Sequence, residues 1–384
     1  MSQWWKAGIV VLVGCAAREA AMEDAAFNPG QTAFESSTYD GSAFVPAGDD
    51  LVFSDGETSY NLIGQAFEGP GADTQTQLGM VNGMTGFWFA WSVHHPGARI
   101  WNNGINNPSA SIVGNSECGV PCDEIRRGCG GGLDCIPSID SPDWTTADDT
   151  ARLRYLTDDD RILGLYNGVA ARAYPLDALW THEIVNDNWA GWEFAVTYCP
   201  LTGSGILVDG VQGGVDMEFG VSGLLYNSNL VMYDRTTDSL YGQMRLVGIS
   251  GERLGESLDT RGVLDTTWGQ WREMFPDTEV LSDRNGISGY PYGDFREDDD
   301  DTFIVTNPPV DGAYRGKMYT LGVTVGGETV LYPFDELREA VGEVGIVQDE
   351  IGGEPVVLAF DLRTDTAALF SRRVGDTVAE FTAE

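Results

Sequence analysis

Two pairs of matching segments constrain the fold of this chain more than any other feature of its sequence. Residues 161–179, RILGLYNGVAARAYPLDAL, match residues 318–337, MYTLGVTVGGETVLYPFDEL. Both predict a strand, a glycine turn, a second strand and a short helix after Tyr-Pro. Residues 190–210, AGWEFAVTYCPLTGSGILVDG, match residues 352–372, GGEPVVLAFDLRTDTAALFSR, and both predict two alternating strands joined by a polar turn. Such similarity within one chain predicts two related lobes.

The second copy stops at the carboxyl terminus, and its missing half is found near the amino terminus. Residues 230–251 resemble residues 51–71, and residues 266–281, TTWGQWREMFPDTEVL, resemble residues 86–101, GFWFAWSVHHPGARIW. We therefore expect a β-rich α+β fold of two quasi-repeated lobes, the second assembled from both ends of the chain as in a circular permutation. The expected parts are lobe A at 151–282, the two halves of lobe B at 49–101 and 317–384, a Cys-rich connecting loop at 102–150 and a connector at 283–316.

Tryptophans recur in the last of these matches. Trp88 and Trp91 stand opposite Trp268 and Trp271, and the members of each pair are three residues apart. Because residues three apart share one face of a helix, this spacing predicts short helices whose tryptophans pack into the core.

Length and charge limit the classes of partner. The chain has 384 residues, of which 42% are hydrophobic, so it can bury substantial cores and is not a disordered chain. It carries 59 acidic and 22 basic residues, a formal net charge of -37 at pH 7. A field of this sign repels phosphate backbones, which excludes nucleic acid as an expected partner.

The amino terminus indicates export. Residues 1–14 contain one early lysine and an apolar run too short to span a bilayer, and the stretch Leu12-Val13-Gly14-Cys15 resembles the lipobox of bacterial lipoproteins. The resemblance implies a lipoprotein signal peptide at 1–14, lipidation of Cys15 and anchoring to a membrane of the cell envelope. An ordinary secretory signal is the alternative, and it also places the protein outside the cytoplasm. Residues 15–48 lack periodicity and predict a flexible tether.

The cysteines divide into a cluster and a single thiol. Four of the six lie in the glycine-rich stretch CGVPCDEIRRGCGGGLDC, which can bury little apolar surface and would be stabilised by two disulfides. Three pairings are possible, and a tetrathiolate zinc site is the alternative. Cys15 is the fifth, which leaves Cys199 alone. The clustered cysteines are Cys118, Cys122, Cys129 and Cys135.

His182 and Cys199 belong to only one of the two expected lobes. In the internal match, His182 stands opposite Val344 and Cys199 opposite Asp361, whereas the following Ile-Val-x-Asp segment recurs. The shared scaffold therefore does not require the pair, which makes it the candidate site.

Five motifs resemble the family known as domain of unknown function 3179. They occur in order as HEIVND at 182–187, YCPL at 198–201, FGVSGLLYNS at 219–228, LVMYDR at 230–235 and TTWGQW at 266–271. The resemblance covers most of residues 135–350 and implies membership of this family, whose activity is unassigned.

Two departures from the family pattern bear on the site. Members usually carry a second cysteine three positions after the first, where this chain has Thr202, so no Cys-x-x-Cys switch is expected. Members also usually place the WFAW and His-Pro segment near the carboxyl terminus, which agrees with a permuted order.

An activated thiol is one possible chemistry. A nearby His182 imidazole would lower the pKa of Cys199 and favour the nucleophilic thiolate, with Glu183 or Asn186 orienting the ring. Backbone N–H groups in residues 202–204 would then stabilise an oxyanion.

Metal binding is the leading hypothesis. A thiolate and an imidazole suit copper or zinc, which need a third or fourth ligand. A non-catalytic binding or scaffold module, in which the thiol is a small buried hydrophobe, is the third class, and enzyme and non-enzyme alternatives stay open. The expected ligands are His182, Cys199, His95 (or His94) and Met232 (or Met217).

Overall fold

The computed structural model describes residues 44–46, 50–102, 117–296, 298, 314–375 and 377–384. The expected signal segment, Cys15 and nearly all of the tether lie outside these residues. The described chain is rich in strands, and its helices span at most seven residues, which confirms a β-rich α+β fold. Among the described residues, no helix is both long and apolar enough to span a membrane.

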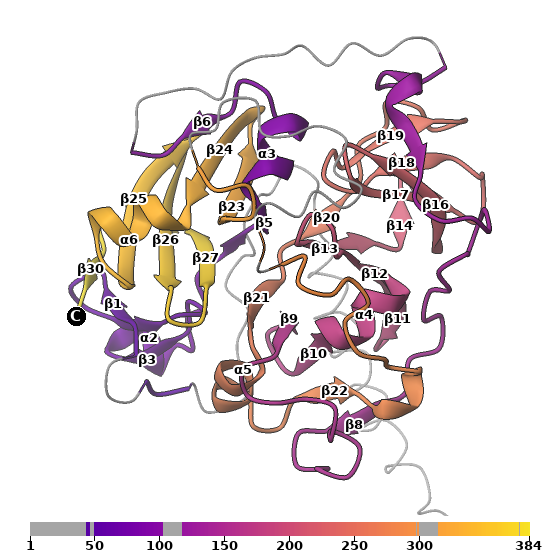
Figure 1. The fold of residues 1–384 in the computed structure, drawn as a ribbon. Coiled ribbons are helices and arrows are strands. Elements are labelled where there is room, and N and C mark those ends of the chain that lie inside the picture. The colour runs from indigo at the N-terminus through magenta and orange to yellow at the C-terminus, as the bar shows by residue number, and fades with distance from the viewer. Residues whose placement is uncertain (1–43, 47–49, 103–116, 297, 299–313, 376) are drawn as a thin grey trace, which may run out of the picture.

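The two ends of the chain form one half of the molecule, and the middle of the chain forms the other half. Figure 1 shows the indigo amino-terminal strands beside the yellow carboxyl-terminal strands, while the magenta and orange segments form the other half. We call residues 117–296 the central half, and residues 50–102 with 314–384 the terminal half.

Each half contains a sheet built around a hairpin that the sequence predicted. In the central half the strand order is β21-β9-β10-β22-β8, and in the terminal half it is β5-β23-β24-β6. Both hairpins are antiparallel, and in both the second hairpin strand pairs in parallel with the next strand of its sheet. The strands are β8 (Trp144–Thr146), β9 (Arg161–Tyr166), β10 (Ala171–Pro175), β21 (Leu264–Thr267), β22 (Glu279–Leu281), β5 (Gly83–Phe87), β6 (Arg99–Ile100), β23 (Tyr319–Val325) and β24 (Glu328–Pro333).

A second antiparallel sheet follows in each half. The order is β11-β12-β13-β20 in the central half and β25-β26-β27-β4 in the terminal half. The two alternating strands predicted on either side of a polar turn are β12–β13 and β26–β27, so both predictions are confirmed. The strands are β11 (Ile184–Trp189), β12 (Trp192–Cys199), β13 (Ser204–Asp209), β20 (Thr260–Arg261), β25 (Val344–Ile351), β26 (Glu354–Asp361), β27 (Thr366–Ser371) and β4 (Met80–Val81).

A third antiparallel sheet lies at the outer side of each half. Its order is β19-β18-β17-β16-β7 in the central half and β3-β2-β1-β30 in the terminal half, with two further two-stranded ribbons, β14-β15 and β28-β29. The strands are β7 (Ile125–Arg127), β16 (Phe219–Tyr226), β17 (Asn229–Asp234), β18 (Leu240–Gly242), β19 (Val247–Ser250), β1 (Val52–Ser54), β2 (Ser59–Asn61), β3 (Ala66–Glu68), β30 (Thr382–Ala383), β14 (Val211–Gln212), β15 (Val215–Asp216), β28 (Arg373–Val374) and β29 (Thr377–Val378).

The helices are short connectors whose apolar sides face the sheets. Two begin directly after the prolines of the Tyr-Pro pairs, which are the N-cap residues and keep an extended backbone. Two further helices, α3 and α5, carry the paired tryptophans. All four tryptophans are buried, as predicted. The helices are α2 (Pro70–Asp73), α3 (Trp88–His94), α4 (Leu176–His182), α5 (Trp268–Met274) and α6 (Phe334–Ala340), with 3-10 turns η1 (Cys122–Glu124) and η2 (Asp283–Asn285).

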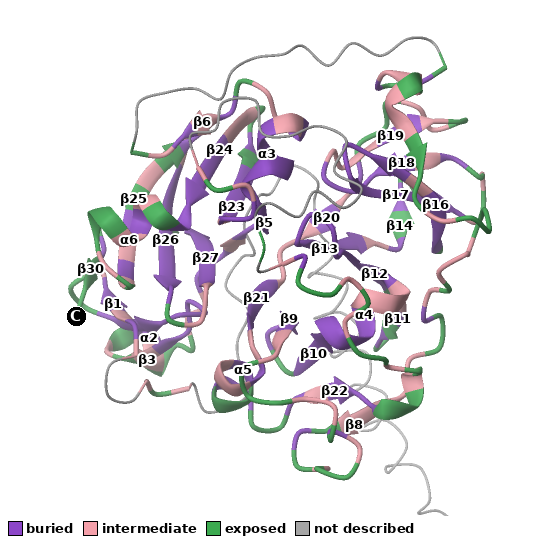
Figure 2. Ribbon diagram, in the orientation of Figure 1, coloured by how far each residue is buried: buried purple, intermediate pink, exposed green. Residues whose placement is uncertain are grey.

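The two halves share their apolar cores. Figure 2 shows buried residues continuing across the boundary between them. Trp88 of the terminal half lies in one cluster with Cys199 and Met232 of the central half. A second cluster joins Trp271 of the central half to Phe370 of the terminal half. Unfolding one half would therefore expose apolar surface of the other.

Each half also contains a tyrosine, an aspartate and an arginine in contact; all three are buried in the central half, whereas the aspartate and arginine of the terminal half are partly exposed. The tyrosine hydroxyl donates to the carboxylate, at 2.7 Å in the central half and 2.9 Å in the terminal half. The arginine donates to the same oxygen, at 2.7 and 3.0 Å. The groups are Tyr174, Asp187 and Arg172 in the central half and Tyr332, Asp349 and Arg99 in the terminal half.

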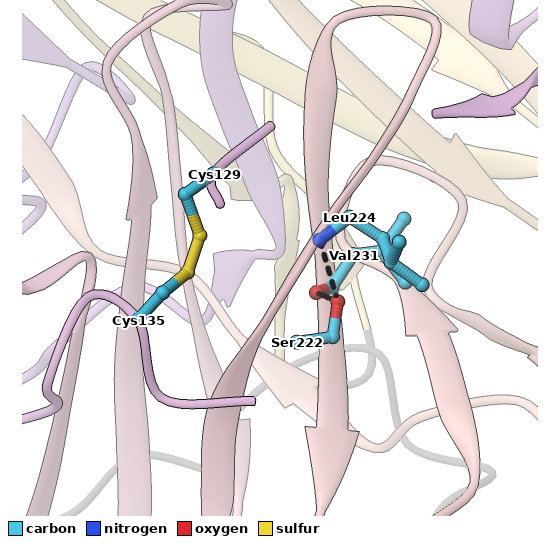
Figure 3. The surroundings of a disulfide bond; sticks show 5 residues. All are labelled: Cys129, Cys135, Ser222, Leu224 and Val231. Carbon is cyan, nitrogen blue, oxygen red and sulfur yellow. Dashed lines mark hydrogen bonds between the residues drawn. A yellow bond between two sulfur atoms is a disulfide. The ribbon is translucent and has the colours of Figure 1, made fainter. Parts of the chain in front are cut away.

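The clustered cysteines form two disulfides, as predicted, and the structure decides the pairing. Cys118 bonds to Cys122, and Cys129 bonds to Cys135. The second bond lies against the bulge of β16, where Gly223 has a φ of 76° and a side chain would contact both sulfurs. Figure 3 shows this disulfide beside Ser222, whose Oγ accepts from the Leu224 N–H at 3.1 Å. The disulfides bring the sulfurs together in pairs, not in the fourfold arrangement that a zinc site needs.

Candidate functional site

The Cys199 thiol lies at the end of β12, where a tight turn leads into β13. The side chain is 1% exposed, and its Sγ–H donates to the Ser228 carbonyl oxygen at 3.7 Å. The residue that follows three positions later, Thr202, donates its N–H to the Cys199 carbonyl at 3.3 Å, which closes the turn. The thiol is thus enclosed by two backbone turns, 199–202 and 227–228.

This environment makes the thiol a weak nucleophile. Burial, and then the nearby Glu183 carboxyl, raise the pKa of Cys199 to about 11. Hydrogen bonds from Thr202 and from the Leu230 N–H act in the opposite direction but are smaller. At neutral pH the sulfur is therefore protonated, whereas reactive cysteines have a lowered pKa.

Glu183 is the only other predicted catalytic residue that lies beside Cys199. It ends α4 in the left-handed conformation, with a φ of 58°, and it is 6% exposed. Burial raises the pKa of Glu183 to about 8. Burial, and then the nearby Glu183 and Cys199, raise the pKa of Tyr292, which lies in the segment after η2.

His182 and Asn186 have other partners. His182 Nδ1 lies 2.7 Å from the Pro137 carbonyl oxygen, and Nε2 faces Gly286. No hydrogen bond joins this ring to the Cys199 thiol in the described part of the chain. Asn186 donates to the Phe219 carbonyl at 2.8 Å and accepts from its N–H at 3.1 Å, which ties β11 to β16. The structure therefore brings together Glu183 and Cys199, but not the expected base or its orienting amide.

The expected metal ligands do not gather at Cys199 either. His95 Nε2 lies 2.9 Å from the Met244 carbonyl, and His94 is fully buried against Tyr226. Met232 shares the apolar core of Cys199 but sits in the middle of β17. Among the described residues, no three His, Cys, Asp or Glu side chains are close enough to hold a metal ion.

A pocket of about 120 Å³ lies where the two halves meet. We call it the junction pocket. The terminal half contributes β4, β5, α3 and β23, and the central half contributes β13, β20 and the turn between β18 and β19. Burial, reinforced by Arg245, lowers the pKa of His95 to about 4, so this ring is neutral at pH 7. The lining residues are 81–84, Trp91, His95, Ile206, Met244, Leu246, Thr260, Gly322, Thr324 and Val325.

Comparison with known sequence families identifies the chain. The family described as "Protein of unknown function (DUF3179)" matches residues 133–383. The chain belongs to this family. The matched range contains all five motifs on which the resemblance rested. No curated protein and no solved structure gives a significant match.

A buried polar network beside Cys199 was missed by sequence reasoning. In this DUF3179 chain the Asn229 amide donates to Thr202 Oγ1 at 2.9 Å and to Gln243 Oε1 at 2.7 Å, and Ser204 Oγ donates to Gln243 Oε1 at 2.7 Å. Thr202, at the position where the resemblance implies a second cysteine, therefore belongs to a hydrogen-bonded core. Its four members come from three separate stretches of the sequence, two of them in turns, so no local pattern marked them as a group.

The junction pocket was also missed, for a different reason. Its walls come from six separate stretches of the DUF3179 chain, and most of its side chains are apolar residues that read as ordinary core. His95 was singled out, but only as a distant ligand for Cys199. Sequence periodicity cannot show which core positions border an opening.

Proposed function

We propose that this DUF3179 protein is a non-catalytic binding module of the cell envelope, with its ligand site in the junction pocket. The pocket itself is the observation that carries the proposal. Seven of its lining residues are Val, Met, Trp, Ile or Leu, and a few polar groups stand among them. Small-molecule sites have this composition and favour the boundary between two structural units.

The size of the pocket limits the ligand. An apolar cavity of about 150 Å³ takes up benzene or xenon. A pocket of about 120 Å³ therefore accommodates an ion with its ligands or a group of up to one small ring.

The environment of Cys199 supports a non-catalytic role. Nucleophilic catalysis needs a thiolate and a base, whereas this thiol has a raised pKa and the candidate base bonds to Pro137. Copper or zinc binding at this thiol would need ligands beyond Glu183. The buried thiol instead packs in the core, as free cysteines commonly do.

We further propose that the two halves are related lobes and that the terminal half is circularly permuted. The matching strand orders of their first two sheets support this, as does the recurrence of the Tyr–Asp–Arg group. The family match begins at residue 133, so the segment 50–102 of the terminal half falls outside it. A permuted order would have this effect.

We also propose that the protein is exported and held at the envelope by a lipid on Cys15. The lipobox-like stretch supports the anchor, and the two disulfides agree with an oxidising compartment. The partner implied by the anchor is a membrane, and the tether would hold the module away from its surface.

Binding of benzene in the junction pocket tests the proposed function. Thr324 lines the pocket and is exposed, so Thr324→Trp puts an indole at the rim without disturbing the core. Thr329, which faces Thr324 across the hairpin but does not line the pocket, provides the matched control Thr329→Trp.

We expect nuclear Overhauser contacts between benzene and the Met84 methyl group in the wild type and in Thr329→Trp, and their loss in Thr324→Trp. Absence of these contacts in the wild type, or their persistence in Thr324→Trp, would overturn the pocket as the binding site.

A further inference from the structure

We propose that the outer edge of β25 is a docking site for an extended basic peptide of a partner protein, which adds to the terminal half as a parallel strand. In the described part of the chain, the strand order β25-β26-β27-β4 gives β25 a neighbour on one side only. Figure 1 shows this strand on the side of the terminal half that faces away from the central half. None of the residues that line the junction pocket belongs to β25, so this inference goes beyond the proposed function.

The central half shows what such an edge accepts. There β11 is the edge strand of the matching sheet, and Ile139 lies along its outer side in a parallel bridge to Val185. The Ile139 N–H donates to the Ile184 carbonyl at 2.9 Å, and its own carbonyl accepts from the Asn186 N–H at 2.9 Å. Ile139 is buried in this position. One extended residue of the Cys-rich loop thus covers the edge of β11.

The strand register identifies the equivalent groups in β25. Counted from the turn that closes each hairpin, Ile346 and Gln348 stand at the positions of Ile184 and Asn186. The Gln348 side chain accepts from the Phe381 N–H at 3.0 Å and donates to its carbonyl at 3.2 Å. The Asn186 amide bonds to one residue of β16 in the same way. The two edges are therefore built alike.

The backbone groups that bind Ile139 in one half are open in the other. Alternate residues of an antiparallel pair direct their N–H and C=O away from the partner strand, and Ile346 and Gln348 are such residues. In the described part of the chain no hydrogen bond reaches the Ile346 carbonyl or the Gln348 N–H. Glu350 differs, because its N–H donates to Asp349 at 2.8 Å and its carbonyl accepts from Arg99 at 2.9 Å. The arginine therefore ends the open stretch on that side.

Apolar side chains beside β25 select an aliphatic residue in the docked strand. Ile139 of the central half packs with the leucines of α4. At the equivalent place in the terminal half, Val347 packs with Phe334 and Leu337 of α6. Val341, just after α6, lies against β25 and is 45% exposed. An aliphatic side chain opposite Val347 would remove apolar surface of this group from water.

Charge favours a basic partner. Residues 334–351 contain six acidic residues and one basic residue. Glu339, Glu343 and Glu350 are exposed. Arginine or lysine on either side of the aliphatic residue would be attracted to them. A second copy of the chain would instead bring like charges together along the two edges, which disfavours self-pairing.

Amide hydrogen exchange of the purified protein tests whether the edge is open. We expect the Gln348 N–H to exchange at least about tenfold faster than the Asn186 N–H, which is held by Ile139 and serves as the internal standard. Equal protection of the two amides would overturn the inference. The edge would then be covered by the chain itself, or by a second copy if the protection is lost on dilution.

Peptide titration, followed by the NMR signal of the Gln348 amide, tests the partner. The probe is Arg-Ile-Pro-Ser-Ile-Arg, which places residues 136–139 between two arginines. We expect a saturable shift, and at least about fivefold weaker binding of the peptide N-methylated at its second isoleucine, which lacks the donor for the Ile346 carbonyl. Methylation of the serine nitrogen, whose N–H would point away from β25, is the matched control.

Charge reversal on the protein completes the test. Glu343→Lys and Glu350→Lys change exposed side chains beside the edge, and each should weaken binding about threefold. Glu252→Lys makes the same change at an exposed position of the central half and should leave the affinity unchanged. Absence of a shift at Gln348, or equal affinity for the two methylated peptides, would overturn the docking site. Equal affinity of the wild type and both charge-reversed variants would overturn the basic character of the partner.

Discussion

Replacement of Glu183 by glutamine should stabilise the protein near neutral pH. The carboxyl is buried at the end of α4 beside the Cys199 thiol and makes no ion pair in the described part of the chain. Burial raises its pKa from 4.5 to about 8. Glutamine has nearly the same shape as glutamate and adopts the left-handed backbone about as readily. The variant therefore removes the ionisable group and changes little else.

The raised pKa sets the sign and size of the effect. In the unfolded chain the carboxyl ionises above pH 4.5, whereas in the folded protein it must stay protonated up to about pH 8. The stability that Glu183 contributes is therefore fully present below pH 4.5 and is lost as the pH rises through the folded-state value. Each pKa unit corresponds to about 1.4 kcal/mol, so the loss is about 3 kcal/mol at pH 7 and about 5 kcal/mol above pH 8.

Urea unfolding of the wild type and Glu183→Gln, with the disulfides intact, measures this difference. All other titrating groups are common to both proteins, so they cancel when one free energy of unfolding is subtracted from the other. We expect the advantage of the variant to grow by about 3 kcal/mol between pH 5 and pH 8. A difference that stays constant over this range would refute the reasoning, because Glu183 would then titrate alike in both states.

The other predictions concern the buried thiol and the two halves. Burial and a pKa near 11 should make alkylation of Cys199 at pH 7.5 at least about 100-fold slower in the folded protein than in urea, and equal rates would show an accessible thiolate. Tyr174→Phe and Tyr332→Phe each remove a buried hydroxyl that donates to an arginine-paired carboxylate, and each should lower the free energy of unfolding by about 1–3 kcal/mol; a loss in one half only would argue against equivalent roles. Gly164→Ala and Gly322→Ala each push a methyl group into a tryptophan ring and should cost about 1–3 kcal/mol, so an unchanged Tm would mean that the rings can move aside.

Local patterns predicted the strands and helices well. Alternation over 190–210 and 352–372 predicted two hairpins that the structure contains as β12–β13 and β26–β27. Tyr-Pro predicted the starts of α4 and α6. These predictions depended on neighbouring residues alone, because strand alternation and helix starts are properties of a few consecutive residues.

The candidate site depended on side-chain direction, which sequence spacing does not contain. His182 and Cys199 flank a hairpin, so their backbones are close, as the bond from the Tyr198 N–H to the Glu183 carbonyl at 2.7 Å indicates. His182, however, is the last residue of α4, and its ring turns to Pro137 in the Cys-rich loop. The residue beside it, Glu183, faces the thiol instead.

The sequence by itself determined the strand and helix pattern, the separation of one thiol from four paired cysteines and the family of the chain. Only the tertiary structure decided the disulfide pairing, the burial of Cys199 and the gathering of Met84, His95 and Met244 around one pocket. The physical reason is that secondary structure follows from interactions between near neighbours, whereas a pocket between two halves forms from residues that are more than 100 positions apart and meet only when the cores close.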